Sequence, residues 1–340
     1  MRILFVSQMW PGPSDPDLGA YLVPVARELE RPGNEVEVVA VTRRGGSRAK
    51  HARLVRDAVA AARRRRPDVV FAHYLLPAGV AGALAGIAGR APLVVMAHGT
   101  DVANLGSIPG VEAATRWVIA RASGVIANSR WLGDRLTDRI PAAAAKLEIA
   151  SCGIDLDAFS PRDPAEARRG LGWEGEGPGF VCVGSLIERK NVVRLADAFA
   201  RLGRGRLAFV GDGPLRGQLE GRPDVTVTGR LPQSEVPRWI AAADVVCQPS
   251  LREPFGQATL EGMAMERTVV ATTVGGPPEF VPADGGVLVD PDDVDALTAA
   301  LERAAAMPTP NPAARAAAAE RDVRRETAKM EAVLERAVAR

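Results

Sequence analysis

The 340-residue chain has few aromatic side chains, few cysteines and no long apolar run. Phe, Trp and Tyr supply only 4% of the residues, although hydrophobic residues reach 47%, so the core must be built from Ala, Val and Leu. Such a core is typical of parallel sheets covered by helices. No segment approaches the length of a bilayer span, and the apolar start reaches Trp-Pro-Gly-Pro too soon for a signal peptide. We therefore expect a cytoplasmic protein.

Several motifs that would define a function class are also missing. Cys152, Cys182 and Cys247 have neither zinc-site nor redox spacing, and each lies in or beside an apolar run, which predicts buried thiols in a reducing compartment. The chain has no G-x-x-x-x-G-K-[ST] loop and no nucleophile-elbow serine. The glycines of G-D-G-P-L-R-G at 211–217 are spaced one residue too far for a dinucleotide fingerprint.

A chain of this length is too long for one ordinary core and fits two α/β domains. Short apolar runs alternate with helical patterns throughout, as in doubly wound sheets. Strands are predicted at 3–7, 35–41, 68–72, 92–97, 124–127, 146–150, 180–184, 207–210, 225–228, 244–248, 269–273 and 286–289. The main helices are predicted at 19–30, 51–66, 77–89, 116–122, 131–137, 192–202, 237–242, 294–306 and from about 313 to the end.

Charge is distributed unevenly along the chain. Through Ala150 there are 20 Lys and Arg against 13 Asp and Glu, whereas the remainder has 23 against 28. A basic first half could face an acidic substrate or an anionic membrane surface, and Arg63–Arg66 is its densest point. For that run we favour the simpler interpretation, a solvated last helical turn before Pro67. Contact with nucleic acid is not expected.

Polar residues follow several predicted strands, at the edge where doubly wound sheets bind ligands. We interpret His98 and Asp101 as a polar turn that presents imidazole and carboxylate to a ligand; the alternative is a histidine that only hydrogen-bonds a loop. For His73, beside Tyr74, the structural interpretation is preferred. Gly19 could let the backbone approach a phosphate or could simply begin a helix.

Charged residues also gather in the second half. Arg189 and Lys190 precede a predicted helix and could clamp a diphosphate together with the helix amides. Asp155 and Asp157 could hold a divalent cation, but we favour capping and turn roles because no strand orients them.

The stretch from 250 to 279 carries the most chemistry. It indicates a polar turn, a short helix that begins near Phe255 or Gly256, a buried strand and a second turn rich in glycine and proline. Glu253 lies on the loop before the helix, and Glu261 lies inside it. Amides at a helix N-terminus favour phosphate, whereas carboxylates suit sugar hydroxyls. The spacing fits a sugar-nucleotide site and fits an ordinary surface helix equally well.

These segments together resemble one known family. E-P-F-G-Q-A-T-L-E-G-M-A followed by V-V-A-T-T-V-G-G-P-P-E is similar to the signature of retaining GT-B glycosyltransferases of family 4. The resemblance extends in order over nearly the whole chain, through M-A-H-G-T-D, G-I-D-L-D-A-F-S-P, V-G-S-L-I-E-R-K-N, V-G-D-G-P-L, V-T-G-R-L-P and A-A-D-V-V-C-Q-P-S.

The resemblance implies an α/β fold of two Rossmann-like, doubly wound parallel-sheet domains that face each other across a cleft. Residues 1–155 would form the acceptor-side domain and 156–321 the nucleotide-sugar domain, with a last helix at about 322–340 packing back on the first. The implied activity is hexosyl transfer with retention from a UDP- or GDP-sugar to a hydroxyl acceptor, without cofactor or metal. The acceptor would belong to polysaccharide, glycolipid or small-molecule glycoside synthesis.

The family's residue roles carry over by position. Glu253 would contact the transferred sugar and Glu261 the ribose, while Gly19 would bring a backbone amide to the diphosphate. The implied catalytic residues are His98, Glu253, Arg189 and Lys190; the implied donor-binding residues are Gly19, Arg230, Leu231, Phe255, Gly256, Gln257 and Glu261; and the acceptor-side candidates are Asp101 and Tyr74. Because the first half is basic, the acceptor could be anionic or lipid-linked, with peripheral contact at the inner face of a membrane.

The chain departs from the family's pattern at three positions. Ser185 stands where arginine is common, which would leave the diphosphate clamp to Arg189 and Lys190. Asn191 replaces a usual glycine, a mild change, and Asn34 stands in place of a common Gly-His pair. Two other function classes stay open: a non-catalytic sugar-nucleotide-binding partner of another transferase, and a phosphorylase or epimerase on the same fold.

Overall fold

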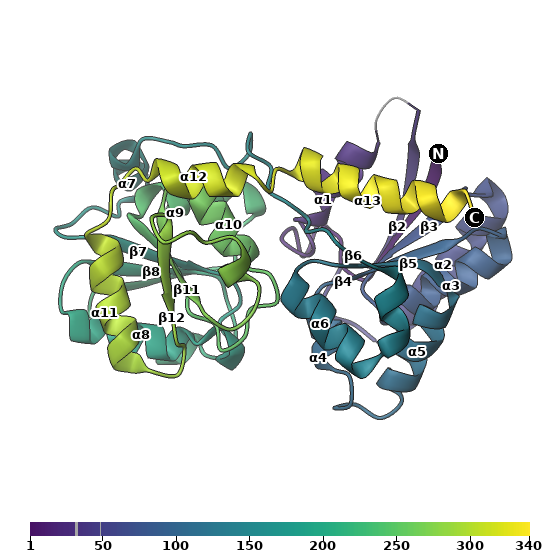
Figure 1. The fold of residues 1–340 in the computed structure, drawn as a ribbon. Coiled ribbons are helices and arrows are strands. Elements are labelled where there is room, and N and C mark those ends of the chain that lie inside the picture. Colours follow the sequence, from purple (N-terminus) through teal and green to yellow (C-terminus); the bar gives the residue numbers. More distant parts are fainter. Residues whose placement is uncertain (31–32, 48) are drawn as a thin grey trace. The chain divides into compact units, whose positions relative to one another are not determined.

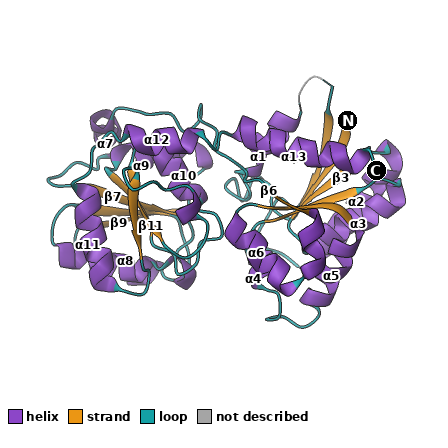
Figure 2. Cartoon of the chain, viewed as in Figure 1, coloured by secondary structure: helices purple, strands orange, loops and turns teal. Residues whose placement is uncertain are grey.

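The computed structural model describes residues 1–30, 33–47 and 49–340, and the chain divides into two compact units. Unit 1 comprises Met1–Gly153 and Val323–Arg340, and unit 2 comprises Ile154–Asp322. Each unit is built on a six-stranded sheet in which all paired strands are parallel (Figure 1). Helices cover both faces of each sheet (Figure 2). The predicted pair of Rossmann-like doubly wound sheets is confirmed.

The sheet of unit 1 has the strand order β2-β1-β3-β4-β5-β6. Its strands are β1 (Arg2–Ser7), β2 (Glu35–Ala40), β3 (Val69–His73), β4 (Leu93–Ala97), β5 (Ala122–Ala127) and β6 (Leu147–Ile149). Every residue of β3 and β4 is buried, as expected for central parallel strands with both faces covered. The strand order reverses between β1 and β3, and the carboxyl ends of strands at such a switch point form the usual ligand crevice.

Two hydrophobic layers hold the helices of unit 1 against its sheet. One face carries α2 (Ala49–Arg65), α3 (Ala78–Gly89), α5 (Val111–Arg121) and α6 (Arg130–Arg139), and the other carries α1 (Leu22–Leu29) and α13 (Val323–Val338). A one-turn helix, α4 (Thr100–Ala103), follows β4. A methyl group at Gly82 would lie 2.8 Å from Cβ of Ala72, so the small residues of α3 allow a close approach to β3.

The sheet of unit 2 has the strand order β12-β11-β10-β7-β8-β9 and reverses between β7 and β10. Its strands are β7 (Gly179–Val183), β8 (Arg206–Val210), β9 (Val225–Gly229), β10 (Val245–Gln248), β11 (Thr268–Thr272) and β12 (Gly286–Val289). One face is covered by α7 (Pro164–Leu171), α9 (Val236–Ala242), α10 (Gln257–Ala264) and α12 (Pro312–Ala319), and the other by α8 (Val192–Leu202) and α11 (Val294–Ala305).

All twelve strands of the described residues lie within two residues of their predicted bounds, whereas three predicted helices differ and α4 and α7 have no predicted counterpart. The final segment, for which the pattern predicts one helix from about 313 and the resemblance implies a last helix at about 322–340, is divided into α12 and α13, and Asp322 between them pairs with Ile154 in an isolated bridge. The predicted helix at 116–122 begins earlier, directly after Gly110 in the left-handed region. The helix predicted from Gly19 begins at Leu22, since Gly19 itself has a φ of +67°.

Candidate functional site

In unit 2, candidate residues from two loops meet at the switch point between β7 and β10. The Lys190 ammonium donates to Oε2 of Glu253 at 2.6 Å, and the Ser250 hydroxyl donates to the same oxygen at 2.9 Å. Nη1 of Arg189 lies 4.0 Å from that oxygen and donates to the carbonyl of Arg252 at 3.0 Å. The structure therefore brings three of the predicted catalytic residues of this unit together.

The carboxylate of Glu253 is buried, with 7% of the residue exposed. Burial raises its pKa, but the charges of Lys190 and Arg189 and the hydrogen bonds from Lys190 and Ser250 outweigh this effect and leave the pKa below its ordinary value. Glu253 is thus ionised at neutral pH and held against a cation.

A backbone interlock places Glu253. Its N–H donates to the carbonyl of Val274 at 3.0 Å, and its own carbonyl accepts from the N–H of Gly276 at 2.9 Å. Gly275 has a φ of +134°, and a methyl group there would lie 1.9 Å from the Glu253 carbonyl oxygen. The second glycine-rich turn is therefore the element that fixes the loop carrying Glu253.

The helix α10 begins at Gln257, within two residues of its predicted start. Gly256 is its N-cap, with a φ of +107°, and Phe255 before it packs on Phe280 with ring centroids 5.3 Å apart. Gln257 is the first helical residue. The N-terminal end of a helix carries partial positive charge, which suits an anion such as a phosphate.

Glu261, one turn into α10, is 5% exposed and accepts a hydrogen bond from Nε2 of Gln233 at 3.3 Å. Burial raises its pKa to about 8, against smaller opposing effects of Gln233 and Lys190. Gln233 belongs to the loop after β9, in which Arg230 is exposed and Leu231 packs against the α9–α10 core. The loop of Arg230 and Leu231, which is predicted to bind the donor, thus lies beside Glu261, the residue predicted to bind the ribose.

The departures from the family's pattern in unit 2 have simple structural consequences. Asn191 has a φ of +59°, a left-handed conformation that asparagine tolerates better than most residues. Its Nδ2 donates to the carbonyls of Pro249 and Pro291 at 3.1 and 2.7 Å, so it ties two loops that a glycine could not tie. Ser185 is exposed on the turn after β7.

Two glycines of the 211–217 segment, Gly211 and Gly213, serve close backbone packing, whereas a methyl group at Gly217 would meet no atom within 4 Å. A methyl group at Gly211 would lie 1.9 Å from the carbonyl oxygen of Gly184, and one at Gly213 would lie 2.4 Å from that of Leu186. The turns after β7 and β8 are thus locked together by backbone contact.

In unit 1, His73 ends β3 and His98 directly follows β4, its neighbour in the sheet. Nδ1 of His73 lies 3.1 Å from Nε2 of His98. The ring of Tyr74 packs 4.4 Å from that of His98, centroid to centroid, and its hydroxyl is 2.5 Å from that of Tyr21. His98 is half-buried, and burial lowers its pKa to about 3, so the imidazole is neutral.

Asp101 organises the turn around His98. Its carboxylate is 5% exposed and accepts hydrogen bonds from the backbone N–H groups of Leu75, His98, Gly99 and Val102, at 3.0, 3.2, 2.8 and 3.1 Å. Burial raises its pKa, and these hydrogen bonds oppose the rise. The structure therefore places this acceptor-side candidate inside the loop, where it positions the backbone on either side of His98.

Gly19 lies in the loop between β1 and α1. A methyl group at this position would lie 2.6 Å from the carbonyl oxygen of Met9, and the φ of +67° is itself left-handed. Arg44 ties the same loop through ion pairs with Asp15 and Asp17 at 3.0 and 2.6 Å. Close packing of the loop thus accounts for a glycine at this position; its predicted contact with a diphosphate stays a prediction.

Other candidates have the structural roles that we favoured. Arg64 and Arg65, in the last turn of α2, form ion pairs with Glu37 at the solvent-exposed side of β2. Oδ1 of Asp155 accepts from the N–H groups of Asp157 and Ala158, as in a turn. All three cysteines are buried, and none forms a disulfide among the described residues.

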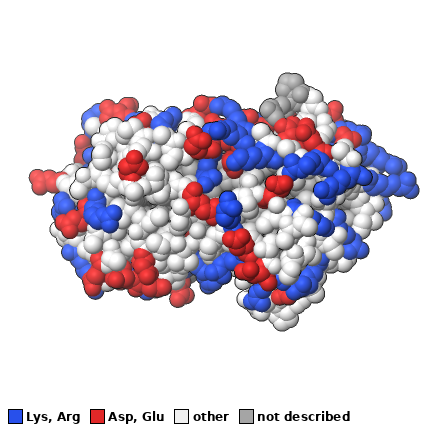
Figure 3. Space-filling model, in the orientation of Figure 1, with Lys and Arg blue, Asp and Glu red and all other residues white. Residues whose placement is uncertain are grey.

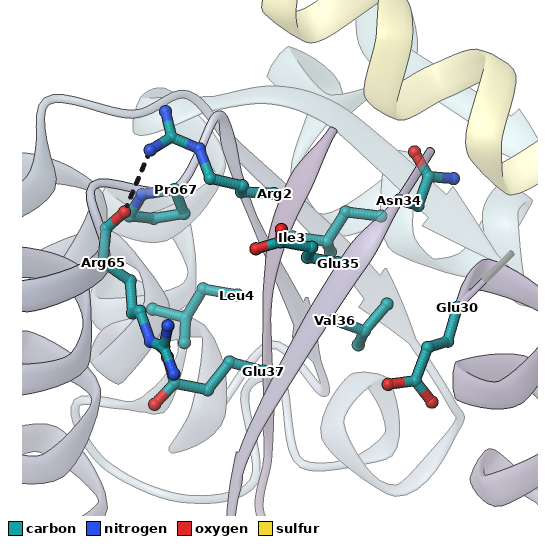
Figure 4. A pocket seen from close by; sticks show the side chains of 10 residues that line it. All are labelled: Arg2, Ile3, Leu4, Glu30, Asn34, Glu35, Val36, Glu37, Arg65 and Pro67. Atoms are coloured by element: carbon teal, nitrogen blue, oxygen red, sulfur yellow. Dashed lines mark hydrogen bonds and ion pairs between the residues drawn. The ribbon is translucent and has the colours of Figure 1, made fainter. Parts of the chain in front are cut away.

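The two units differ in charge, and unit 1 has a pocket away from the predicted site. Unit 1 has 25 Lys and Arg against 16 Asp and Glu, whereas unit 2 has 18 against 25. Lys and Arg side chains lie along α13 on the face shown in Figure 3. A pocket of about 220 Å³ opens at the amino ends of β1 and β2, beside Arg2 and Glu35 (Figure 4). It lies at the opposite edge of the sheet from His98, and none of the predicted site residues is among the described residues that line it.

Within the described ranges, no group of three or more His, Cys, Asp and Glu side chains is arranged to hold a metal ion. The same part of the chain contains no helix of the length and apolarity needed to cross a bilayer. That the protein needs no metal, and that it is cytoplasmic, stay predictions.

Both units of the chain match models of known protein families. Residues 18–158 match the model of Glycosyltransferase Family 4, and residues 177–306 match that of Glycosyl transferases group 1. The chain is 34% identical over 271 residues to the GDP-mannose-dependent alpha-(1-6)-phosphatidylinositol monomannoside mannosyltransferase of Mycolicibacterium smegmatis, covering 71% of this chain and 69% of that protein. It is 30% identical over 241 residues to the putative teichuronic acid biosynthesis glycosyltransferase TuaC of Bacillus subtilis, covering 70% of this chain.

The match spans only 61% of the length of TuaC. Among solved structures, HepE of Anabaena in complex with UDP and glucose superposes with a TM-score of 0.77 at 25% identity, covering 98% of this chain and 99% of that one. The chain thus belongs to glycosyltransferase family 4 and has the GT-B fold.

Proposed function

We propose that this protein is a retaining glycosyltransferase that moves a hexose from a UDP- or GDP-sugar to a hydroxyl acceptor. The observation that carries the proposal is the Lys190–Glu253 contact at the switch point of unit 2, which places a cation and a carboxylate within 2.6 Å of each other at a ligand-binding edge. A diphosphate needs the first group and a sugar hydroxyl needs the second. Two similar proteins support the donor class. The mannosyltransferase of Mycolicibacterium smegmatis is GDP-mannose-dependent, and HepE of Anabaena has been solved in complex with UDP-glucose.

The leaving group explains why cations are needed. Breaking the bond between the sugar and the phosphate leaves negative charge on the nucleoside diphosphate, and preorganised cations and amides stabilise that charge. Lys190, Arg189 and the N-terminus of α10 are the groups proposed for this role. Lys190 is already held at its ammonium by Glu253, so little reorganisation is needed when the diphosphate arrives.

The sugar explains why carboxylates are needed. Its transition state resembles an oxocarbenium ion, and a carboxylate oriented on its hydroxyls favours that state. We assign Glu253 to the sugar and Glu261 to the ribose, and we assign no covalent nucleophile. The leaving phosphate is proposed to take the proton from the hydroxyl group of the acceptor substrate. In unit 1, His98 is proposed to hydrogen-bond the transferred sugar near the reacting carbon.

The acceptor is proposed to be anionic or lipid-linked, because unit 1 carries an excess of 25 basic over 16 acidic residues. Binding to vesicles that contain an anionic lipid, measured by sedimentation, should weaken as salt is raised. Absent or salt-insensitive binding would contradict the membrane part of this proposal and would leave the donor part untouched.

The direct test is a thermal-shift screen with UDP, GDP and their sugars, followed by assays of slow donor hydrolysis. A ligand that binds only the folded protein raises the melting temperature. The matching donor should also be hydrolysed, and Glu253→Gln and Lys190→Ala should each reduce turnover at least about a hundredfold, the range seen when one preorganised charge-stabilising donor is removed. Arg201→Ala, which removes an exposed arginine of α8 that is paired with Asp295 of α11, is the matched control.

Each other outcome has a definite meaning. Donor binding without turnover by any preparation would indicate a binding partner of another transferase. Release of sugar 1-phosphate after addition of inorganic phosphate would indicate a phosphorylase, and conversion of the donor sugar without an acceptor would indicate an epimerase. The anomeric configuration of the product, read by NMR, tests retention.

A further inference from the structure

His73 and His98 form one buried pair although they come from different strands. Nδ1 of His73 and Nε2 of His98 lie 3.1 Å apart, within hydrogen-bond distance. One of these two nitrogens must carry the proton and the other must accept it, because two lone pairs or two N–H groups at this distance would repel. The choice between them decides which nitrogen of His98 is protonated.

The surroundings of His73 are apolar. The residue is completely buried, and its ring stacks on Phe5 with centroids 4.1 Å apart and tilts against Phe71 at 4.3 Å. Burial lowers its pKa, as it does for His98, so both rings are neutral near pH 7. The far nitrogen of His73, Nε2, is buried and has no hydrogen-bond partner among the described residues.

That unpartnered nitrogen discriminates between the two arrangements. If His98 donated, His73 would have to keep its own proton on Nε2, as a buried N–H with nothing to receive it. If His73 donates from Nδ1, its Nε2 keeps only a lone pair. Buried N–H groups without a partner are rarer in proteins than buried acceptors without one, so the second arrangement is favoured.

The remaining contacts of His98 fix its position without using Nδ1. Its backbone N–H donates to the Asp101 carboxylate, and its carbonyl accepts from Nδ2 of Asn128 at 3.1 Å. No described residue hydrogen-bonds Nδ1 of this half-buried ring. With Nε2 occupied by the proton of His73, the proton of His98 itself must lie on Nδ1.

We propose that His73 is a positioning residue that fixes His98 as the Nδ1–H tautomer, so that His98 offers a hydrogen-bond donor to its ligand and cannot act there as a base. The ligand would be an oxygen of the transferred sugar; this identification rests on the proposed function, whereas the tautomer does not. A hydrogen-bond donor beside the sugar orients a hydroxyl oxygen and leaves the proton transfer to other groups.

Histidine nitrogen NMR tests the tautomer on the full wild-type chain without any ligand. The sequence has only three histidines, so long-range proton–nitrogen correlation spectra of protein labelled at histidine resolve each ring. We expect both His73 and His98 to be protonated on Nδ1. His51 is an internal control with the opposite expectation, because its buried, unpartnered nitrogen is Nδ1. Protonation of His98 on Nε2 would overturn the proposal.

Two variants extend the test. His73→Phe keeps the aromatic stack on Phe5 but removes the donor, so the two tautomers of His98 should become mixed. His73→Asn keeps an N–H donor near the position of Nδ1 and should restore the single Nδ1–H tautomer. A His98 ring that stays wholly Nδ1–H in His73→Phe would overturn the role of His73, and the wild-type spectrum decides the tautomer even if a variant does not fold.

Turnover separates this inference from the proposed function. If a donor is found, His73→Phe should lower kcat about tenfold with little change in the donor KM, which is the loss of roughly one hydrogen bond in the transition state, and His73→Asn should recover most of it. An inactive protein with the predicted tautomers would contradict only the proposed function. An active protein with His98 protonated on Nε2 would contradict only the inference.

Discussion

Lys190 and Glu253 lie 63 residues apart in the chain, and their side chains are joined by a hydrogen bond of 2.6 Å at the edge of one sheet. Their side chains are only 16% and 10% exposed, so neither charge is well solvated by water. A pair of this kind depends on both partners, because each alone would be an uncompensated charge in a buried place.

Removal of the ammonium should therefore destabilise unit 2. We expect Lys190→Met to lower the free energy of unfolding by about 3 kcal/mol, since Glu253 would be left without its main counter-charge. Scanning calorimetry of the variant should show a lower melting temperature for one of the two units.

The matched control is Arg189→Ala, because this neighbouring cation is 43% exposed and 4.0 Å from the same oxygen. Its removal should change stability by less than about 1 kcal/mol. The double variant Lys190→Met/Glu253→Gln should recover much of the loss. Equal stability of Lys190→Met and the wild type would show that the pair is not a buried ion pair in solution.

Protonation of Glu253 at acidic pH should lower the stability of the fold. Because its folded pKa lies below the ordinary value of 4.5, its ionised form stabilises the fold above that pH, and the contribution is lost as the pH falls through the folded pKa. The melting temperature should therefore fall less steeply between pH 7 and pH 3 for Glu253→Gln than for the wild type. Parallel curves for the two proteins would contradict the assigned direction.

Glu261 should act in the opposite direction. Its folded pKa of about 8 lies above the ordinary value of 4.5, so the fold binds a proton that the unfolded chain releases, and stability falls as the pH rises from 4.5 through 8. Glu261→Gln should remove this slope and gain at least about 1 kcal/mol over the wild type at pH 9, since each pKa unit is worth about 1.4 kcal/mol. Measurement of both proteins from pH 5 to 9 checks the sign.

The backbone interlock at Gly275 should be sensitive to a single methyl group. Gly275→Ala places Cβ within 1.9 Å of the Glu253 carbonyl oxygen, so the loop that carries Glu253 must move. We expect a loss of more than about 3 kcal/mol in stability and loss of nucleotide-induced thermal shift. Gly221→Ala is the control for strain alone, because Gly221 has a φ of +79° with no atom within 4 Å of the added methyl, and it should cost about 1 to 2 kcal/mol.

Asp101 should matter for the position of His98. Asp101→Ala removes the acceptor of four buried backbone N–H groups and should lower stability by about 3 kcal/mol. It should also shift the NMR signals of the His98 ring, because two of those groups are the amides of His98 and Gly99. Unchanged His98 signals in a folded Asp101→Ala protein would show that the carboxylate does not hold this turn.

Local pattern was sufficient for much of the fold. The strands were predictable within two residues because short runs of three to six residues, most of them apolar, between polar or glycine- and proline-rich turns leave few other options. The start of α10 was predictable because Gly256 and the residues after it form a recognisable helix beginning. Local pattern did not predict the division of the last helix, because Ala-rich sequence on both sides of 320–322 is compatible with one continuous helix; the resemblance implied a last helix at about 322–340, and the bridge between Asp322 and Ile154 marks the break.

The roles of the site residues divide in the same way. Two doubly wound sheets and the residue types at the ends of their strands can be predicted from the amino-acid sequence, because periodicity and turn chemistry are local properties of the chain. The contacts of Lys190 with Glu253 and of His73 with His98 become visible in the folded protein alone, as does the inward turn of Asp101 toward backbone amides. These contacts depend on which strands become neighbours and how their loops interlock, and distances across a sheet edge are not encoded in the spacing of residues along the chain.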